Sequence, residues 1–250
     1  MLIDTHCHIH WADFPVPIDD VIGQSHENGV NQMICVGTTA ADSKLAIDFA
    51  AQYDGMYATV GVHPHHAKNG LDGADALLEA NRDKIVAMGE IGLDYFHNHS
   101  PREDQIKILR VQIKLALRYN LPIIFHVREA FDDFWPIFDE FTGIRGVLHS
   151  FTDTAENLQA GLDRGLYIGV NGYSTFIKDE DQKKMFAMIP IEKMVFETDA
   201  PFLTPVPFRG KVNIPAYVKN IAEYHGVARN VGFDEISSIT TANARDLFNL

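Results

Sequence analysis

The sequence predicts an α/β protein, a (β/α)8 TIM barrel that forms a single domain over residues 1–250. Eight short apolar runs of strand length recur along the chain, and longer segments with helical periodicity separate them. A length of 250 residues suits one barrel, and no shift in composition divides the chain. Strands that alternate with helices imply βαβ units and a parallel sheet. A doubly wound open sheet is the alternative architecture.

The elements are expected in the following order. The strands are Leu2–Thr5, Gln32–Val36, Tyr57–Val62, Ile85–Gly89, Pro122–His126, Gly146–His149, Tyr167–Val170 and Met194–Thr198. The helices are Ile18–Asn28, Ala40–Tyr53, Gly73–Asn81, Arg102–Tyr119, Ala130–Phe141, Thr154–Arg164, Lys178–Met188, Pro215–His225 and Thr241–Asn249. The helix 102–119 has the clearest pattern, because Ile106, Leu109, Ile113 and Leu117 form an apolar stripe at helical spacing.

The balance of charges is acidic, with a net charge of −13. A broad basic face for duplex DNA is therefore not expected, although a bound cation can still attract an anion locally. Two cysteines do not make a disulfide framework, which favours a reducing, cytoplasmic location. The N-terminus lacks a signal-peptide pattern, and no apolar run has the length of a membrane span. No obligate protein partner is evident.

The first strand carries a pair of histidines. His6 and His8 are two residues apart, so their side chains share one face of the strand, and Cys7 points to the other face as a packing residue. At the carboxyl end of a barrel strand, the shared face opens onto the barrel mouth, where active sites of this fold lie. Two imidazoles placed in this way can bind a divalent metal.

Residues of metal-binding type also follow the apolar runs of other strands. They are Glu90, His126, His149 and Asp199. Ionisable groups gathered at one mouth need partners, and metal ions suit these side chains. Four histidines and two carboxylates exceed one four-coordinate site, so two divalent ions are expected, and a carboxylate such as Glu90 can bridge them. The candidate ions are Zn, Mn, Mg and Fe; the mixed ligands favour Zn, Mn or Fe.

In this order of motifs the chain resembles the TatD family of metal-dependent deoxyribonucleases, among the amidohydrolase-like barrels. The motifs are D-T-H-C-H at 4–8, G-V-H-P-H at 61–65, G-E-I-G-L-D-Y at 89–95, F-H-V-R-E-A at 125–130, L-H-S-F at 148–151, E-T-D-A-P-F-L-T-P at 197–205, R-G-K-V-N-I-P-A-Y-V at 209–218 and T-T-A-N-A-R-D-L-F at 240–248. They extend from one end of the chain to the other, and the motif at 197–205 is the most distinctive.

The resemblance implies hydrolysis of phosphodiester bonds in DNA by a metal-activated water. It assigns one metal to His6, His8, Glu90 and Asp199, and a second to His126, His149 and the bridging Glu90. It makes Asp199 the residue that holds or deprotonates the attacking water. It makes Glu197 a supporting carboxylate, and it places His63 near the scissile phosphate.

Further side chains are expected to contact the substrate or to support the ligands. His65, Arg128, Arg209 and Lys211 are candidate phosphate contacts, and Asp94 is expected to orient a ligand or to cap a loop. Three positions depart from the family pattern. Val127 stands where serine or cysteine is usual, and it should point away from the barrel mouth. His97 follows an aromatic residue where the family often has arginine, and Ile214 stands where glutamate is common.

The expected activity is exonuclease-like cleavage of single-stranded DNA, because a barrel mouth admits a chain end or a flexible strand better than a continuous duplex. The alternative is an amide or ester hydrolase of the amidohydrolase type: a lactonase, a deaminase or an aminoacyl-ester deacylase. Many amidohydrolases bridge their metals with a modified lysine, whereas the fourth strand here offers Glu90. A non-catalytic metal protein is a third possibility, although structural sites are usually closed and rich in cysteine.

Overall fold

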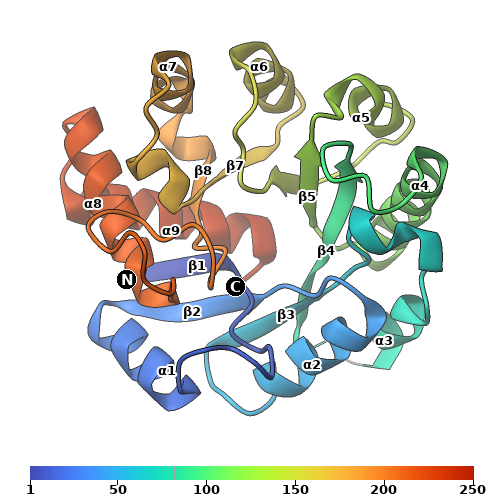
Figure 1. Cartoon of the computed structure of the whole chain (residues 1–250), viewed down its shortest axis with the longest axis horizontal. Coiled ribbons are helices and arrows are strands. Elements are labelled where there is room, and N and C mark those ends of the chain that lie inside the picture. The colour runs from blue at the N-terminus through green and yellow to red at the C-terminus, as the bar shows by residue number, and fades with distance from the viewer. Residues whose placement is uncertain (81–82) are drawn as a thin grey trace. The chain divides into compact units, whose positions relative to one another are not determined.

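The computed structural model describes residues 1–80 and 83–250 and confirms the predicted (β/α)8 fold class (Figure 1). Eight strands form one sheet in the order β1 to β8. This sequential order excludes the doubly wound alternative, in which the strand order reverses at a switch point. The chain divides into two compact units, unit 1 (Met1–Ile34 with Ser150–Leu250) and unit 2 (Cys35–His149).

Strands and helices alternate along most of the chain. The strands are β1 (Leu2–Cys7), β2 (Val30–Cys35), β3 (Met56–Val60), β4 (Ile85–Asp94), β5 (Ile123–Arg128), β6 (Gly146–Leu148), β7 (Tyr167–Val170) and β8 (Met194–Phe196). The helices are α1 (Ile18–Glu27), α2 (Ala40–Ala50), α3 (Ala74–Ala80), α4 (Arg102–Tyr119), α5 (Phe131–Phe138), α6 (Ala155–Asp163), α7 (Glu180–Met188), α8 (Val218–Arg229) and α9 (Phe233–Phe248).

Unit 1 joins the two ends of the chain. Strand β8 pairs in parallel with β7, and a parallel bridge between Cys7 and Ala200 connects the end of β1 to the residues after β8. Helices α8 and α9 pack against β1 and β8. All six residues of β1 are buried, as expected for a strand covered on both faces.

Unit 2 holds a parallel run of strands from β3 to β6. Helix α4 packs on β4 and helix α5 on β5 (Figure 1). The core beside β5 is aromatic: the Phe125 ring meets the Phe134 ring edge to face, with centroids 5.1 Å apart, and Phe138 lies 5.9 Å from both.

Strand β4 is longer than predicted. The predicted strand ends at Gly89, whereas β4 continues through Asp94. A register irregularity between Met88 and Ile91 allows the extra residues to pair with β5 as far as Arg128. Glu90 therefore lies within a strand and not after it.

The helices at the C-terminal end differ most from prediction. Helix α9 begins at Phe233, eight residues before the predicted Thr241, and α8 begins at Val218 instead of Pro215. The serines and threonines in the first part of α9 have low intrinsic helix propensity, so the sequence pattern does not indicate a helix there. In the structure α9 packs against β1, β8 and α8 and buries Ile236, Leu247 and Phe248, so packing overrides propensity.

The other helices match their predicted positions to within three residues at each end, apart from one residue that the structure does not cover. The predicted helix Gly73–Asn81 corresponds to α3, and its last residue, Asn81, lies outside the described residues. Within 1–80 and 83–250, no helix combines the length and apolar character that a membrane crossing requires.

Candidate functional site

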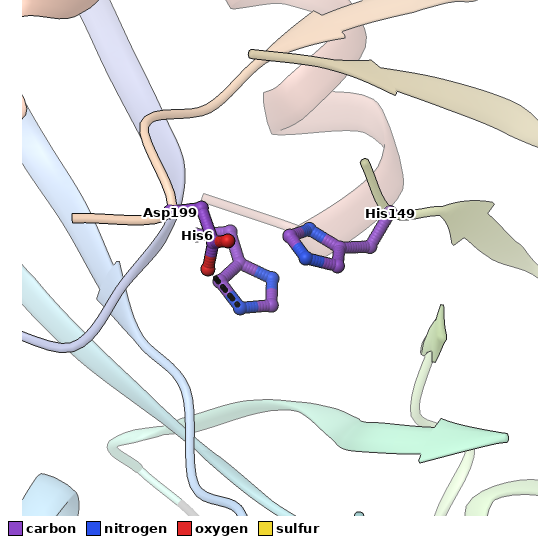
Figure 2. Close-up of side chains that lie close together, drawn as sticks. All are labelled: His6, His149 and Asp199. Atoms are coloured by element: carbon purple, nitrogen blue, oxygen red, sulfur yellow. Dashed lines mark ion pairs between the residues drawn. The ribbon is translucent and has the colours of Figure 1, made fainter. Parts of the chain in front are cut away.

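The first group of site residues in unit 1 is the β1 cluster, which consists of His6, His8 and Asp199. The Nε2 atoms of His6 and His8 are 3.2 Å apart. The Asp199 Oδ1 atom lies 3.7 Å from His6 Nε2 and 3.5 Å from His8 Nε2. Figure 2 shows the Asp199 carboxylate against the His6 ring, with the ion pair between them dashed. Strand β1 ends at Cys7, so His8 lies one residue beyond it, but the expectation that the two imidazoles point together is confirmed.

The geometry of the β1 cluster fits a metal ion. Ligand atoms about 2.1 Å from a tetrahedral centre are about 3.4 Å from one another. The three separations in the cluster, 3.2, 3.5 and 3.7 Å, are close to that value. Two imidazole nitrogens and one carboxylate oxygen also form a donor set that zinc and other divalent transition metals accept.

A buried carboxylate holds the β1 cluster together. Asp4 accepts hydrogen bonds from the backbone N–H of His6 (3.2 Å) and of Thr198 (2.9 Å), and from the Thr198 hydroxyl (2.5 Å). These bonds tie the strand that carries His6 to the turn that carries Asp199. Asp4 is fully buried, and burial raises the pKa of its carboxyl well above the ordinary value. The sequence analysis gave Asp4 no role.

The second group of site residues lies in unit 2 and is called the β4 cluster: Glu90, His126, His149 and His63. The Glu90 Oε1 atom lies 2.8 Å from His126 Nδ1, 3.7 Å from His149 Nε2 and 3.7 Å from His63 Nε2. The donor atoms of His63, Glu90 and His126 all lie within 4.8 Å of one another. One carboxylate thus faces three imidazoles, which is again a donor set that fits a divalent cation.

Asp94 supports the β4 cluster through His126. The Asp94 Oδ2 atom accepts from His126 Nε2 (3.1 Å), and the opposite ring nitrogen of His126 faces Glu90. A carboxylate that holds the far nitrogen of a ligating histidine fixes its tautomer and ring orientation. Burial lowers the pKa of His126, but the hydrogen bonds with Asp94 and Glu90 raise it more, to about 9.

Asp94 also caps the loop that follows β4, which is one of the two roles expected of it; that it orients a metal ligand stays a prediction. Its carboxylate accepts from the backbone N–H of His97 (2.9 Å), from His97 Nδ1 (3.0 Å) and from His65 Nε2 (2.9 Å). Burial raises the pKa of Asp94, but its hydrogen bonds with His126 and His97 outweigh that effect and hold the pKa below the ordinary value. His97 and His99 are exposed, as expected, although His97 is tied to Asp94.

A glycine brings β4 and β5 together beside these residues. Gly92 has φ +155°, and a Cβ atom at this position would collide with the His126 carbonyl group. Only glycine permits both the conformation and the close approach. The motif that contains Glu90 and Asp94 thus needs the glycine between them.

His63 and His65 flank Pro64 at the start of a short 3-10 helix, Pro64–Asn69. His63 Nδ1 accepts from the backbone N–H of His65 (3.1 Å), which directs Nε2 of His63 toward Glu90. Burial lowers the pKa of both histidines, and for His63 the neighbouring His126 lowers it further. Both imidazoles are therefore neutral near pH 7 and can serve as hydrogen-bond donors or ligands.

Glu197 lies in a different setting from Asp199. Strand β8 ends at Phe196, and Asp199 has φ +58°, so the regular strand that would place both carboxylates on one face is interrupted. Glu197 is buried, and its Oε1 atom accepts from the backbone N–H of Ser150 (2.6 Å). A Cβ atom at Gly169 would collide with the Glu197 carboxylate, so the glycine makes room for it.

The predicted cationic contacts are exposed and rest on aromatic rings. The Arg128 guanidinium carbon lies 4.1 Å from the centroid of Phe96, and that of Arg209 lies 3.5 Å from the centroid of Phe176. Lys211 Nζ is 5.4 Å from the Phe208 ring centroid. These cation–π contacts restrain long side chains that remain open to an anion. The sequence analysis did not recognise the aromatic partners.

The strand order and the two clusters are those of a metal-dependent hydrolase built on a (β/α)8 barrel. A family model described as TatD related DNase matches residues 3–249, so the chain belongs to the TatD family. This match spans nearly the whole chain and favours the single domain predicted for residues 1–250, which stays a prediction.

Curated and solved relatives agree with this assignment. An uncharacterized metal-dependent hydrolase, YabD of Bacillus subtilis, is 37% identical, and the match covers 100% of both chains. The 3'-5' ssDNA/RNA exonuclease TatD of Salmonella typhimurium is 33% identical, with 100% of this chain and 99% of the relative covered. The crystal structure of YjjV, a TatD homologue from Escherichia coli, superposes with a TM-score of 0.92 at 29% identity, with 100% of this chain and 98% of that chain covered.

Proposed function

We propose that this hydrolase cleaves the phosphodiester bonds of single-stranded DNA from the 3′ end. The observation that carries the proposal is the convergence of imidazole and carboxylate donors in the β1 and β4 clusters of a TatD family member. The polarity comes from the relative named 3'-5' ssDNA/RNA exonuclease, which is 33% identical over its full length.

The chain binds two divalent metal ions, drawn from Zn, Mn, Mg and Fe. One ion would be held by His6, His8 and Asp199, and the other by Glu90, His126 and His149. When bound, such ions lower the pKa of water and neutralise charge on phosphoryl oxygens. The mixed imidazole and carboxylate ligands favour a transition metal over Mg.

The protein side chains orient the substrate and move the proton. The Asp199 carboxylate, which is partly exposed, accepts the proton of the attacking water. A bond forms between the water oxygen and phosphorus, and the bond from phosphorus to the 3′ oxygen breaks as that oxygen takes up a proton. Glu197 supports the site by accepting the hydrogen bond from the backbone N–H of Ser150. The phosphate oxygens are bound by imidazole and cationic side chains, namely those of His63, His65, Arg128, Arg209 and Lys211.

End-labelled single-stranded DNA tests the proposal. The protein is loaded separately with Mg, Mn, Zn or Co, and a 5′-labelled oligonucleotide is expected to shorten progressively from its 3′ end. In Asp199→Asn, which cannot accept the proton, we expect kcat to fall by about 1,000-fold, within the range for the loss of a general base. Asp13→Asn, which alters an exposed aspartate, serves as the matched control.

Two results contradict the proposal. The first is the absence of cleavage with every metal while circular dichroism reports an intact fold. The second is hydrolysis of amide or ester substrates in a parallel panel without hydrolysis of phosphodiesters, which would establish the amidohydrolase alternative.

A further inference from the structure

Two aromatic side chains follow residues of the β1 cluster at the same spacing. Trp11 comes three residues after His8, and its backbone N–H donates to the His8 carbonyl (3.2 Å). Phe202 comes three residues after Asp199, and its backbone N–H donates to the Asp199 carbonyl (2.8 Å). Each aromatic residue is therefore fixed by a turn that begins at a proposed metal ligand.

The two rings meet and form a surface, here called the aromatic platform. The Trp11 and Phe202 centroids are 5.9 Å apart at an interplanar angle of 67°. The Trp11 ring also stacks on the His8 ring, with centroids 4.6 Å apart and an angle of 18°. Phe202 is 51% exposed and Trp11 is partly exposed, so core packing does not account for their position.

A buried asparagine keeps the platform in place. Asn213 is fully buried, and its Nδ2 atom donates to the carbonyls of Thr198 (2.9 Å) and Phe202 (2.5 Å). The backbone N–H of Asn213 donates to the Pro201 carbonyl (3.1 Å). The residues on either side of Asp199 are thus held by one side chain, and Phe202 presents its ring without a large entropic cost of ordering.

We propose that Trp11 and Phe202 form a stacking site for the nucleobase attached to the nucleotide whose phosphate is cleaved. The inference rests on the proposed nuclease function and identifies how that function selects its substrate. Aromatic rings stack on any nucleobase, so the site accepts DNA and RNA of any sequence. A base that is paired within a duplex is already stacked and cannot use the platform, which favours single strands.

The net charge of the chain favours such a contact. A net charge of −13 disfavours the long basic groove through which many proteins bind nucleic acid by its backbone. Stacking on aromatic side chains is the other general source of affinity for single strands, and it does not depend on net charge. The exposed rings beside the β1 cluster provide it where the scissile phosphate would bind.

Two substrates that differ only in their bases test the inference. One is a short thymidine oligomer, and the other is an oligomer of the same length made of base-free deoxyribose phosphate units. We expect kcat/KM of the unsubstituted protein to be about tenfold higher for the thymidine oligomer, the lower part of the range for one stacked base. Trp11→Ala should lower the thymidine value to the base-free value and leave the base-free value unchanged.

Further variants distinguish the loss of a stacking contact from a loss of folding. Trp11→Phe retains an aromatic face and should preserve most of the preference for the thymidine oligomer. Phe202→Ala should reduce that preference without removing the ring that stacks on His8. Phe233→Ala, which removes an exposed aromatic side chain from α9, should change neither value. Thermal unfolding of each variant verifies its fold.

The outcomes separate this inference from the proposed function. If the unsubstituted protein cleaves neither oligomer, the nuclease function fails and the inference fails with it. If it cleaves both equally well, the nuclease function stands and the stacking site is overturned. If Trp11→Ala and Phe202→Ala lower kcat/KM equally for both oligomers, the rings act on the fold of the β1 cluster and not on a base.

Discussion

The β1 and β4 clusters bring imidazoles and carboxylates together by different means. In the β1 cluster the anchor is Asp4, which binds backbone N–H groups and the Thr198 hydroxyl. Among the residues that the structure describes, Asp4 makes no hydrogen bond to an imidazole ring. In the β4 cluster the anchor is Asp94, which binds the rings of His65, His97 and His126 directly. One buried aspartate thus positions ligands through the main chain, and the other positions them through side chains.

This difference predicts which property depends on each aspartate: the stability of the fold, or metal affinity and activity. Loss of a main-chain anchor should reduce the stability of the fold, because buried amide groups lose their partners. Loss of a side-chain anchor should reduce metal affinity and activity, because the ligand rings rotate more freely while the backbone remains paired.

The largest effect on stability is expected for Asp4→Ala. The substitution leaves two buried backbone N–H groups and the Thr198 hydroxyl without their acceptor, and each unsatisfied group costs about 1–3 kcal/mol. We expect the free energy of unfolding to fall by about 3 kcal/mol or more, measured by chemical denaturation. Asp13→Ala is the control, because Asp13 is exposed in the same unit. Unchanged stability with reduced metal affinity would remove the distinction between the clusters.

An intermediate effect is expected for Asp94→Asn, and it should appear in function. An amide group cannot accept from three imidazole rings as a carboxylate does. Metal affinity or kcat should fall by about 10- to 100-fold, the usual cost of losing a partner that orients a ligand. The measurements are metal titration by calorimetry and steady-state kinetics, with Asp132→Asn as the exposed control. A large fall in the unfolding temperature at constant activity would argue against this role.

Two histidines, His126 in unit 2 and His225 in unit 1, have pKa values that are shifted in opposite directions. His126 has carboxylate partners that raise its pKa to about 9, whereas His225 in unit 1 lies in a cavity with Ser174, Lys183, Tyr224 and Arg229. Burial, with a smaller contribution from Arg229, lowers the pKa of His225 to about 3. The side chain makes a 2.8 Å hydrogen bond with the Ser174 hydroxyl.

His225 therefore gives the smallest of the expected effects, a dependence of stability on pH. Above pH 6.5, the ordinary value, His225 is neutral in both states. As the pH falls below 6.5 toward 3, only the unfolded state takes up the proton, so stability is lost. Between pH 7.5 and 5.5 this contribution is about 1 kcal/mol. His225→Gln, which keeps a hydrogen-bonding group but does not titrate, should show a weaker dependence; an identical dependence would contradict the assignment.

The repeating units and the ligand types could be predicted from the sequence, because periodicity and residue chemistry are local. Glu90 illustrates the limit: its position within β4 depends on a register irregularity that only pairing with β5 reveals. Asp4 shows that the sequence does carry a signal for this anchor, because it precedes His6 by two residues and so shares its face of β1. The start of α9 was missed because its serines and threonines are stabilised by packing and not by propensity.

The hydrogen bonds between Asp4 and Thr198 connect residues that are 194 positions apart in the chain. His6 and His8 are synthesised about 190 residues before their carboxylate partner, Asp199. At a synthesis rate of about 5–20 residues per second, roughly 10–40 seconds separate the synthesis of the two histidines from that of Asp199. Unit 2, which is one uninterrupted segment, can assemble its own cluster during that time. The β1 cluster is therefore completed only after the whole of unit 2 has been synthesised, so unit 2 can gather its donor set first.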